Sequence, residues 1–111
     1  MKRTFKNDLR FDNIRFSDKL PDTGDYENCI FNCCDFSDSD LSDSNFIDCT
    51  FQGCNLSLTK LINTSFKETL FKDCKLLGLH FEDCNKLLLS FEFDSCSIDV
   101  SSFNELKLNK T

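Results

Sequence analysis

A large apolar residue recurs at every fifth position of this chain for twelve consecutive steps. In a chain with 40% hydrophobic residues, such a run has a chance probability of roughly 2 in 100,000, so the repeat is real. A period of five fits neither a helix, which repeats every 3.6 residues, nor a strand, which repeats every two. The period therefore constrains the fold of the whole chain. The twelve centres are Tyr26, Phe31, Phe36, Leu41, Phe46, Phe51, Leu56, Leu61, Phe66, Phe71, Leu76 and Phe81.

The residue two places before each centre is small in every unit except the last, which has Leu79. Residues two apart share one face of an extended segment, so the small and the large side chain point inward and the residue between them points outward. The remaining two residues of each unit are mostly Asp, Ser, Asn, Gly or Lys, which suit a turn. Each unit is therefore an extended stub and a turn. The small residues are Gly24, Cys29, Cys34, Ser39, Ser44, Cys49, Cys54, Thr59, Thr64, Thr69 and Cys74.

A longer period shows how many units complete one turn. The segments FNCCDF, FQGCNL and FKDCKL begin at Phe31, Phe51 and Phe71, and each has a cysteine three places later. A spacing of four units predicts a coil of square section, whose successive turns stack like strands about 4.8 Å apart. The sequence therefore predicts an all-β fold of stacked square coils.

The repeat changes register near the C-terminal end. Lys86 falls on an expected core position, whereas FDSCSI, which begins at Phe93, matches the three earlier segments after a shift of two residues. We expect a short insertion within 85–92, with Lys86 pointing to solvent. Phe31, Phe51, Phe71 and Phe93 are then predicted to stack on one interior face.

Two segments flank the regular repeat. Residues 1–25 are expected to form an N-terminal extended cap and loop, because Pro21 interrupts the period, and residues 26–111 to form the repeat domain. The shifted register continues to Thr111 without a capping helix, although stacked repeats need polar caps. We expect either that a partner covers this end, as in a homodimer through the uncapped coil, or that the chain is a fragment of a longer repeat protein, which we favour.

These units resemble the pentapeptide-repeat family, whose repeats centre on Leu or Phe with a small residue two places earlier. The resemblance covers 24–81 and, after the shift, 91–111. It implies a right-handed quadrilateral β-helix. The small residue is commonly Ala in the family, whereas this chain has no Ala and uses Cys, Ser and Thr. Some members protect bacterial DNA gyrase and topoisomerase IV from quinolones or peptide toxins by imitating duplex DNA. Many others have no known role.

Charge suggests one candidate surface. The net charge of −6 disfavours direct binding of nucleic acid, and residues 21–55 contain eight acidic residues without Lys or Arg. One interpretation is a solvated surface that protects the edges of the stack. The other is a negative face that docks on a basic groove of a partner in competition with phosphates. The aspartates at outward or turn positions are Asp35, Asp38, Asp40, Asp43 and Asp48, and they have no basic residue near them along the chain.

The residue types that usually carry chemistry are arranged for packing here. Seven of the eight cysteines fall in small positions, and no C-x-x-C pair of a metal site is present. Cys33 is the exception, because it falls at a turn and should be exposed. The single histidine, His80, should point outward, away from any inward cysteine. We therefore expect no catalytic residue, no metal site and no cofactor.

The sequence contains neither a signal peptide nor a segment long enough to cross a bilayer, so we expect a soluble, cytoplasmic protein that does not bind membranes. Two functions stay open. The first is a non-enzymatic protein-interaction scaffold, with a protein as partner. The alternative is a DNA mimic that binds DNA gyrase or topoisomerase IV, in the manner of the members that confer quinolone resistance.

Overall fold

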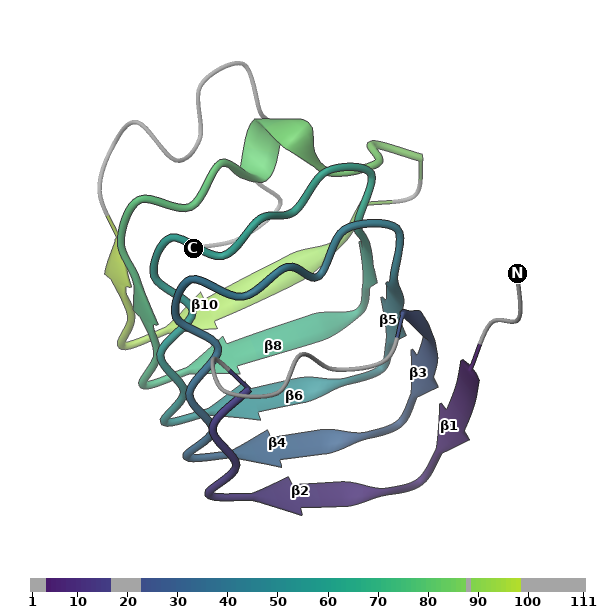
Figure 1. The fold of residues 1–111 in the computed structure, drawn as a ribbon, viewed down its shortest axis with the longest axis horizontal. Coiled ribbons are helices and arrows are strands. Elements are labelled where there is room, and N and C mark those ends of the chain that lie inside the picture. The colour runs from purple at the N-terminus through teal and green to yellow at the C-terminus, as the bar shows by residue number, and fades with distance from the viewer. Residues whose placement is uncertain (1–3, 17–22, 88, 99–111) are drawn as a thin grey trace.

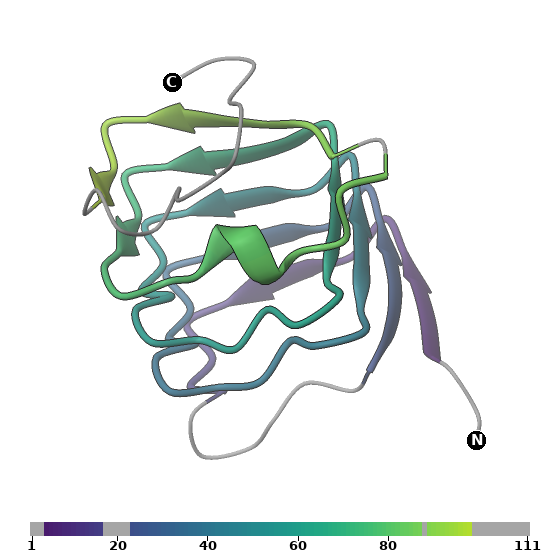
Figure 2. The same ribbon diagram turned by 90° about the horizontal axis from the view of Figure 1, so that it is seen from above.

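The chain winds as a β-helix of square section (Figures 1 and 2). The structure, a computed structural model, describes residues 4–16, 23–87 and 89–98. Every strand pair is parallel, because each coil returns to the same face one turn later. The predicted all-β quadrilateral β-helix is confirmed. In the described residues, no helix is long and apolar enough to cross a bilayer.

Two of the four faces are continuous sheets. Face 1 consists of β1 (Thr4–Asn7), β3 (Gly24–Glu27), β5 (Asn45–Ile47) and β7 (Ser65–Lys67). Face 2 consists of β2 (Arg10–Asp12), β4 (Ile30–Asn32), β6 (Thr50–Gln52), β8 (Thr69–Lys72) and β10 (Phe91–Asp94). Figure 1 shows the strands of face 2 stacked as one wall of the coil.

The other two faces are held by shorter pairings. Face 3 contains the bridges that join Arg15, Asp35, Asn55 and Lys75, and it ends in the pair β9 (Lys75–Leu76) and β11 (Ser97–Ile98). Face 4 contains the single bridge between Asp40 and Lys60. The 3₁₀ helix η1 (Phe81–Asp83) follows on this side of the coil, opposite the wall of face 2 (Figure 2).

The repeat centres fill the interior as columns of stacked side chains. On face 2, ring centroids are 4.8 Å apart between Phe31 and Phe51, 5.1 Å between Phe51 and Phe71, and 5.5 Å between Phe71 and Phe93. The predicted stack of these four rings is confirmed. Phe51 is also in edge-to-face contact with rings from neighbouring columns, such as Phe46 at 5.4 Å. The columns therefore form one continuous core.

The corners of the coil adopt the left-handed backbone conformation. Within the described units, the residue two places after the centre has a positive φ, between 51° and 69°, except after Phe81, where Asp83 belongs to η1. Asn, Asp and Gly tolerate this conformation better than other residues, and they occupy most corners. The local sequence thus bends the chain at every fifth residue. The non-glycine corner residues are Asp8, Asn13, Asn28, Cys33, Asp38, Asp43, Asp48, Leu58, Asn63, Glu68, Asp73 and Ser95.

The last described coil is two residues longer than the others. The N–H of Asn85 still donates to the carbonyl of Thr64, 21 residues earlier, as the N–H of Ser65 does to Ser44, whereas Phe91 pairs with Thr69 at a spacing of twenty-two instead of twenty. The extra length is taken up between these points, where the chain leaves the regular path. Lys86 is exposed, as predicted, and its Nζ donates a hydrogen bond of 2.8 Å to the carbonyl of Glu82.

The N-terminal segment pairs with the next coil in regular register. Lys6 lies opposite Tyr26, and Thr4 lies opposite Gly24. A Cβ atom at Gly24 would lie 2.0 Å from the carbonyl oxygen of Thr4, so only glycine fits this approach. Pro21, and the C-terminal end at 99–111, fall outside the described residues, so the expectations made for them stay predictions.

Candidate functional site

Three of the five candidate aspartates occupy corners of one coil. Asp38, Asp43 and Asp48 are exposed and have φ values of 58°, 65° and 53°. Aspartate is one of the few non-glycine residues that enters this conformation readily. Each of these residues therefore has a structural reason for its identity, whether or not a partner binds it.

The other two candidates stabilise the turns that follow them. The carboxylate of Asp35 accepts hydrogen bonds from the hydroxyl of Ser37 at 2.6 Å and from its backbone N–H at 2.9 Å, and these bonds lower the pKa of Asp35. Asp40 accepts a bond of 2.9 Å from the N–H of Ser42. Its pKa is lowered by hydrogen bonding with Ser42 and by the nearby charge of Lys60. Both sets of contacts therefore favour the ionised carboxylate.

The structure distributes the five aspartates around the coil and does not gather them on one face. Asp35 lies on face 3 and Asp40 on face 4, with Asp38 at the corner between them. Asp43 is at the corner of faces 4 and 1, and Asp48 is at the corner of faces 1 and 2, diagonally opposite Asp38. We call these five residues the acidic belt. A flat partner can contact only part of it at once.

Basic residues lie closer to the acidic belt than their distance along the chain indicates. Stacking places Arg15 beside Asp35 and Lys60 beside Asp40, because residues twenty apart pair across coils. Both charges lower the pKa of the aspartate they approach. The expectation of a field without neighbouring cations is therefore wrong for these two positions. It failed because it considered neighbours in sequence only.

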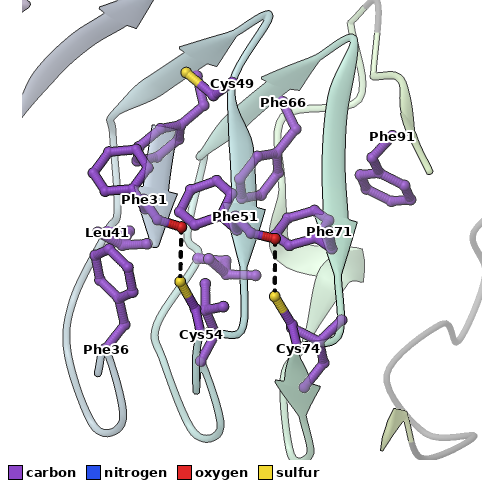
Figure 3. Packing of buried hydrophobic residues seen from close by; sticks show 14 of the residues in the cluster. Phe31, Phe36, Leu41, Cys49, Phe51, Cys54, Phe66, Phe71, Cys74 and Phe91 are labelled. Atoms are coloured by element: carbon purple, nitrogen blue, oxygen red, sulfur yellow. Dashed lines mark hydrogen bonds between the residues drawn. The ribbon is translucent and has the colours of Figure 1, made fainter. Parts of the chain in front are cut away.

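The small residues of the interior share one hydrogen bond. Cys54 donates its thiol to the carbonyl of Phe31 at 3.2 Å, and Cys74 donates to that of Phe51 at 3.1 Å (Figure 3). Thr59 and Thr64 make the same bond with hydroxyl groups, to Phe36 at 2.7 Å and to Leu41 at 2.8 Å. In each case the acceptor precedes the donor by 23 residues. Cys and Thr thus add an inter-coil bond that Ala cannot make.

Burial favours the neutral form of several of these thiols. It raises the pKa of Cys49 and of Cys84 to about 12. Contact with Cys34 and Cys74 in the same column, together with burial, raises the pKa of Cys54, and hydrogen bonding to Cys54 lowers the pKa of Cys34 to about 7 and lowers that of Cys74. Thiolate is the nucleophilic and metal-binding form of cysteine, so Cys49, Cys54 and Cys84 serve packing. Cys33 lies at a corner and is exposed, as predicted.

The part of the chain that the structure describes contains no group of three or more His, Cys, Asp or Glu side chains able to hold a metal ion. His80 is exposed, and its Nδ1 lies 3.1 Å from a carboxylate oxygen of Glu82. Cys84, the cysteine nearest in sequence, is buried. The imidazole is therefore paired with an acid and is not arranged to activate a thiol.

Two features of the surface escaped the sequence reading. Side-chain amides of Asn32, Asn45 and Asn63 each donate to the aspartate twenty residues earlier, at 3.1, 2.6 and 3.1 Å. The signal was present as Asp and Asn at a spacing of twenty. The second feature is a pair of exposed apolar side chains, Leu58 and Ile62, which line a shallow cleft of about 340 Å³ on face 4. No periodic signal marks them, since outward positions follow no apolar pattern.

The comparison with family models agrees with this geometry. The model described as a pentapeptide repeat region matches residues 25–103. This chain belongs to the pentapeptide-repeat family. No curated protein matches the sequence significantly.

The search of solved structures finds QnrB1, a plasmid-mediated fluoroquinolone resistance protein, among its matches. The full-length structure has 21% sequence identity and a TM-score of 0.37, with 85% of this chain and 48% of that chain covered. A trypsin-treated variant of QnrB1 has 24% identity and a TM-score of 0.40, with 85% and 50% covered. The present chain therefore spans about half the length of these proteins.

Proposed function

We propose that this pentapeptide-repeat chain is a non-enzymatic, cytoplasmic scaffold that binds a protein partner. The observation that supports the proposal is the contrast between interior side chains, which hold the fold together, and outward side chains, which are exposed to solvent. Interior side chains are occupied by stacking and by inter-coil hydrogen bonds. Outward side chains make few packing contacts. They project from a stack in which backbone hydrogen bonds join each coil to the next. Such a surface suits recognition rather than chemistry, which requires converging reactive groups.

The alternative is a DNA mimic that acts on DNA gyrase or topoisomerase IV, and the acidic belt is the observation that favours it. Duplex DNA carries one negative charge per about 1.7 Å, so a coil about 4.8 Å high would need roughly three. Residues 31–50 carry five aspartates and no basic residue, which exceeds that density. Residues 51–70, however, carry two lysines and one glutamate. The charge reverses in the next coil, so the scaffold is the better supported function.

Partner capture tests the scaffold. The tagged chain is incubated with native cytosol, and bound proteins are identified by mass spectrometry. The matched control is a chain in which all five residues of the acidic belt are changed to Asn, which keeps the turn and corner conformations. We expect wild type to retain a specific protein. Failure to retain any protein would count against the scaffold.

Inhibition of gyrase tests the alternative. Added at micromolar concentration, a mimic would alter DNA supercoiling by gyrase or cleavage poisoned by a quinolone. The five-Asn control and rising salt would both weaken that effect, since charge drives it. We expect no effect from this chain. A homodimer through the C-terminal end stays a separate prediction, to be tested by sedimentation.

A further inference from the structure

The first coil leaves interior side chains partly uncovered at the N-terminal end of the stack. Phe11, the first ring of the column on face 2, is only half-buried. Leu9 and Ile14 point inward at positions where the next coil has small residues, and they are 44% and 37% exposed. The residues at those positions in the next coil, Cys29 and Cys34, are 0% and 2% exposed. Repeat ends that face water are usually polar, so this apolar end indicates contact with another molecule.

The same end presents the open edge of a sheet. β2 is the last strand of face 2 (Figure 1), and in the described part of the chain no strand lies beyond it. Leu9 and Asn13 make backbone hydrogen bonds of 2.9 Å with β4. Because backbone groups of alternate residues in a parallel strand point to the same side, Phe11 also bonds toward β4. The N–H and C=O groups of Arg10 and Asp12 therefore point outward from the stack.

A second copy of the chain fits this edge in one register only. A two-fold axis across the end of the stack makes the two β2 strands antiparallel, and residues that exchange hydrogen bonds then lie directly opposite each other. Arg10 and Asp12 are the two residues of β2 that can do so. Pairing Arg10 with Arg10, or Asp12 with Asp12, would place like charges together, which is destabilising. Pairing Arg10 with Asp12 joins opposite charges, and the axis repeats that pair.

We propose that this chain forms a two-fold dimer through its first coil, in which the β2 strands pair antiparallel with Arg10 opposite Asp12 of the second copy. In this register Phe11 lies opposite Phe11 of the second copy, so the column of face 2 continues across the axis. Leu9 and Ile14 are covered at the same time. The inference does not depend on the scaffold function, and it uses the opposite end of the stack from the homodimer expected at the C-terminus.

The charged side chains are already arranged for this contact. Nε of Arg10 lies 3.0 and 3.1 Å from the two carboxylate oxygens of Asp12, and the amide of Asn32 donates to Asp12 at 3.1 Å. Even so, the side chains of Arg10 and Asp12 are 58% and 44% exposed. In the dimer each Arg10 would lie between Asp12 of its own strand and Asp12 of the second copy. The edge is thus complementary to itself, which favours a second copy over an unrelated protein.

Charge reversal tests the register. The full chain is examined by sedimentation equilibrium between about 5 and 500 μM, because one coil end is a small interface and should associate weakly. We expect an equilibrium of monomer and dimer for wild type. Arg10→Asp and Asp12→Arg should each raise the dissociation constant about tenfold or more, since each places like charges opposite one another.

A mixture of the two variants separates the register from a general effect of charge. One variant then has two acids on β2 and the other has two arginines, so an equimolar mixture should form a heterodimer with opposite charges in both pairs. Native mass spectrometry with one variant labelled with nitrogen-15 identifies that heterodimer. The mixture does not restore the bond between Arg10 and Asp12 within one strand. Its recovery therefore reports the contact between copies.

Asp94→Arg is the matched control. Asp94 is exposed and lies on β10, at the opposite edge of the same sheet, so this variant should dimerise like wild type. Circular dichroism verifies that each variant is folded, and the double variant Arg10→Asp, Asp12→Arg should dimerise again because its pairs are merely exchanged.

Three results would overturn the proposal. The first is a wild type that stays monomeric over the whole range of concentration. The second is a mixture that stays monomeric although both variants are folded. The third is loss of the dimer in Asp94→Arg but not in Arg10→Asp, which would assign self-association to the C-terminal end. A monomeric wild type that loses a cytosolic partner on Leu9→Ser and Ile14→Ser would assign the first coil to another protein.

Discussion

The coils between Tyr26 and Leu76 and the coil that follows them are built from the same five-residue unit. They differ in the spacing at which their residues pair with the neighbouring coil. In the first group each face pairs with the next coil at a spacing of twenty residues. In the last coil, faces 2 and 3 pair at a spacing of twenty-two. The N–H of Asn85 still donates to Thr64, 21 residues earlier, as the N–H of Ser65 does to Ser44, so the two extra residues lie between Asn85 and Phe91. They leave the phenylalanine column of face 2 intact.

The contacts of face 2 survive this insertion. Phe93 stays on the ring of Phe71 at 5.5 Å, and Cys96 still donates to the carbonyl of Phe71 at 3.1 Å. The two extra residues are absorbed before β10, so they do not displace Phe93 from the column. Burial of an aromatic ring stabilises by more than a backbone hydrogen bond exchanged with water does, so core contact sets the register.

The largest expected effect is the loss of stability when an aromatic ring is removed, and it should differ between the two regions. Phe51→Ala should lower the free energy of unfolding by about 3–5 kcal/mol, since it empties a site enclosed by stacked rings on both sides. Phe93→Ala should cost about 1–2 kcal/mol, because its ring is only half-buried. Urea denaturation followed by circular dichroism measures both. Equal losses would contradict the assignment of Phe51 to the centre of the core.

Alkaline pH should destabilise both regions through their buried thiols. Burial raises the pKa of Cys49 and Cys84 from 9.0 to about 12. Below pH 9 these thiols are protonated in folded and unfolded chains alike, and their contribution to stability is complete. As the pH rises from 9 toward 12, the unfolded chain loses these protons first. Each thiol should then lower the free energy of unfolding by about 1 kcal/mol per pH unit.

Urea midpoints at pH 8, 9 and 10 measure this loss. Cys49→Ala should reduce the slope, whereas Cys33→Ser should not change it, because Cys33 is already exposed. A slope that is the same in both variants would show that burial of Cys49 is not its cause.

The inter-coil bond of the small residues should be visible as a difference between two conservative changes. Thr64→Val removes a buried hydroxyl that bonds Leu41 at 2.8 Å, and it should cost about 1–2 kcal/mol. Ser39→Ala removes a buried hydroxyl that has no hydrogen-bond partner, so it should be neutral or slightly stabilising. Thermal melts of the two variants decide the matter. A larger loss for Ser39→Ala would refute the role given to this bond.

The smallest effect is expected at the corners of the acidic belt. Asp38→Asn, Asp43→Asn and Asp48→Asn should each stay within about 0.5 kcal/mol of wild type, because Asn tolerates a positive φ. Asp38→Ala should cost about 1 kcal/mol, since Ala does not. Denaturant midpoints measure these changes in stability. If Asp38→Asn and Asp38→Ala had equal effects, the contribution of Asp38 would come from its charge and not from its backbone conformation.

The core was predictable because its information is local and periodic. FDSCSI alone indicated that Phe93 joins the column of Phe71, and the structure has this pairing. The surface was predictable only in part. Corner aspartates were expected as turns, but the cation beside Asp40 lies twenty residues away in the sequence and was missed.

The helix η1 could not be predicted from the pattern for a different reason. Phe81 falls on the repeat like every earlier centre, yet the turn after it is a 3₁₀ helix. The register is still regular at Asn85, whose N–H donates to Thr64, and it has shifted by Phe91. The local sequence therefore signals the length of the insertion but not the conformation of the chain around it.

The hydrogen bond from the interior cysteines and threonines to a carbonyl 23 positions earlier gives the stack a direction. Cys54 needs Phe31 in place, and Cys74 needs Phe51 in place, whereas no earlier coil needs a later one for this bond. A ribosome releases the chain in the same order, beginning at the N-terminus. Each new coil can therefore form this bond with a coil that is already folded, while the rest of the chain is still being synthesised. The β-helix can thus grow from the N-terminus as the chain is translated.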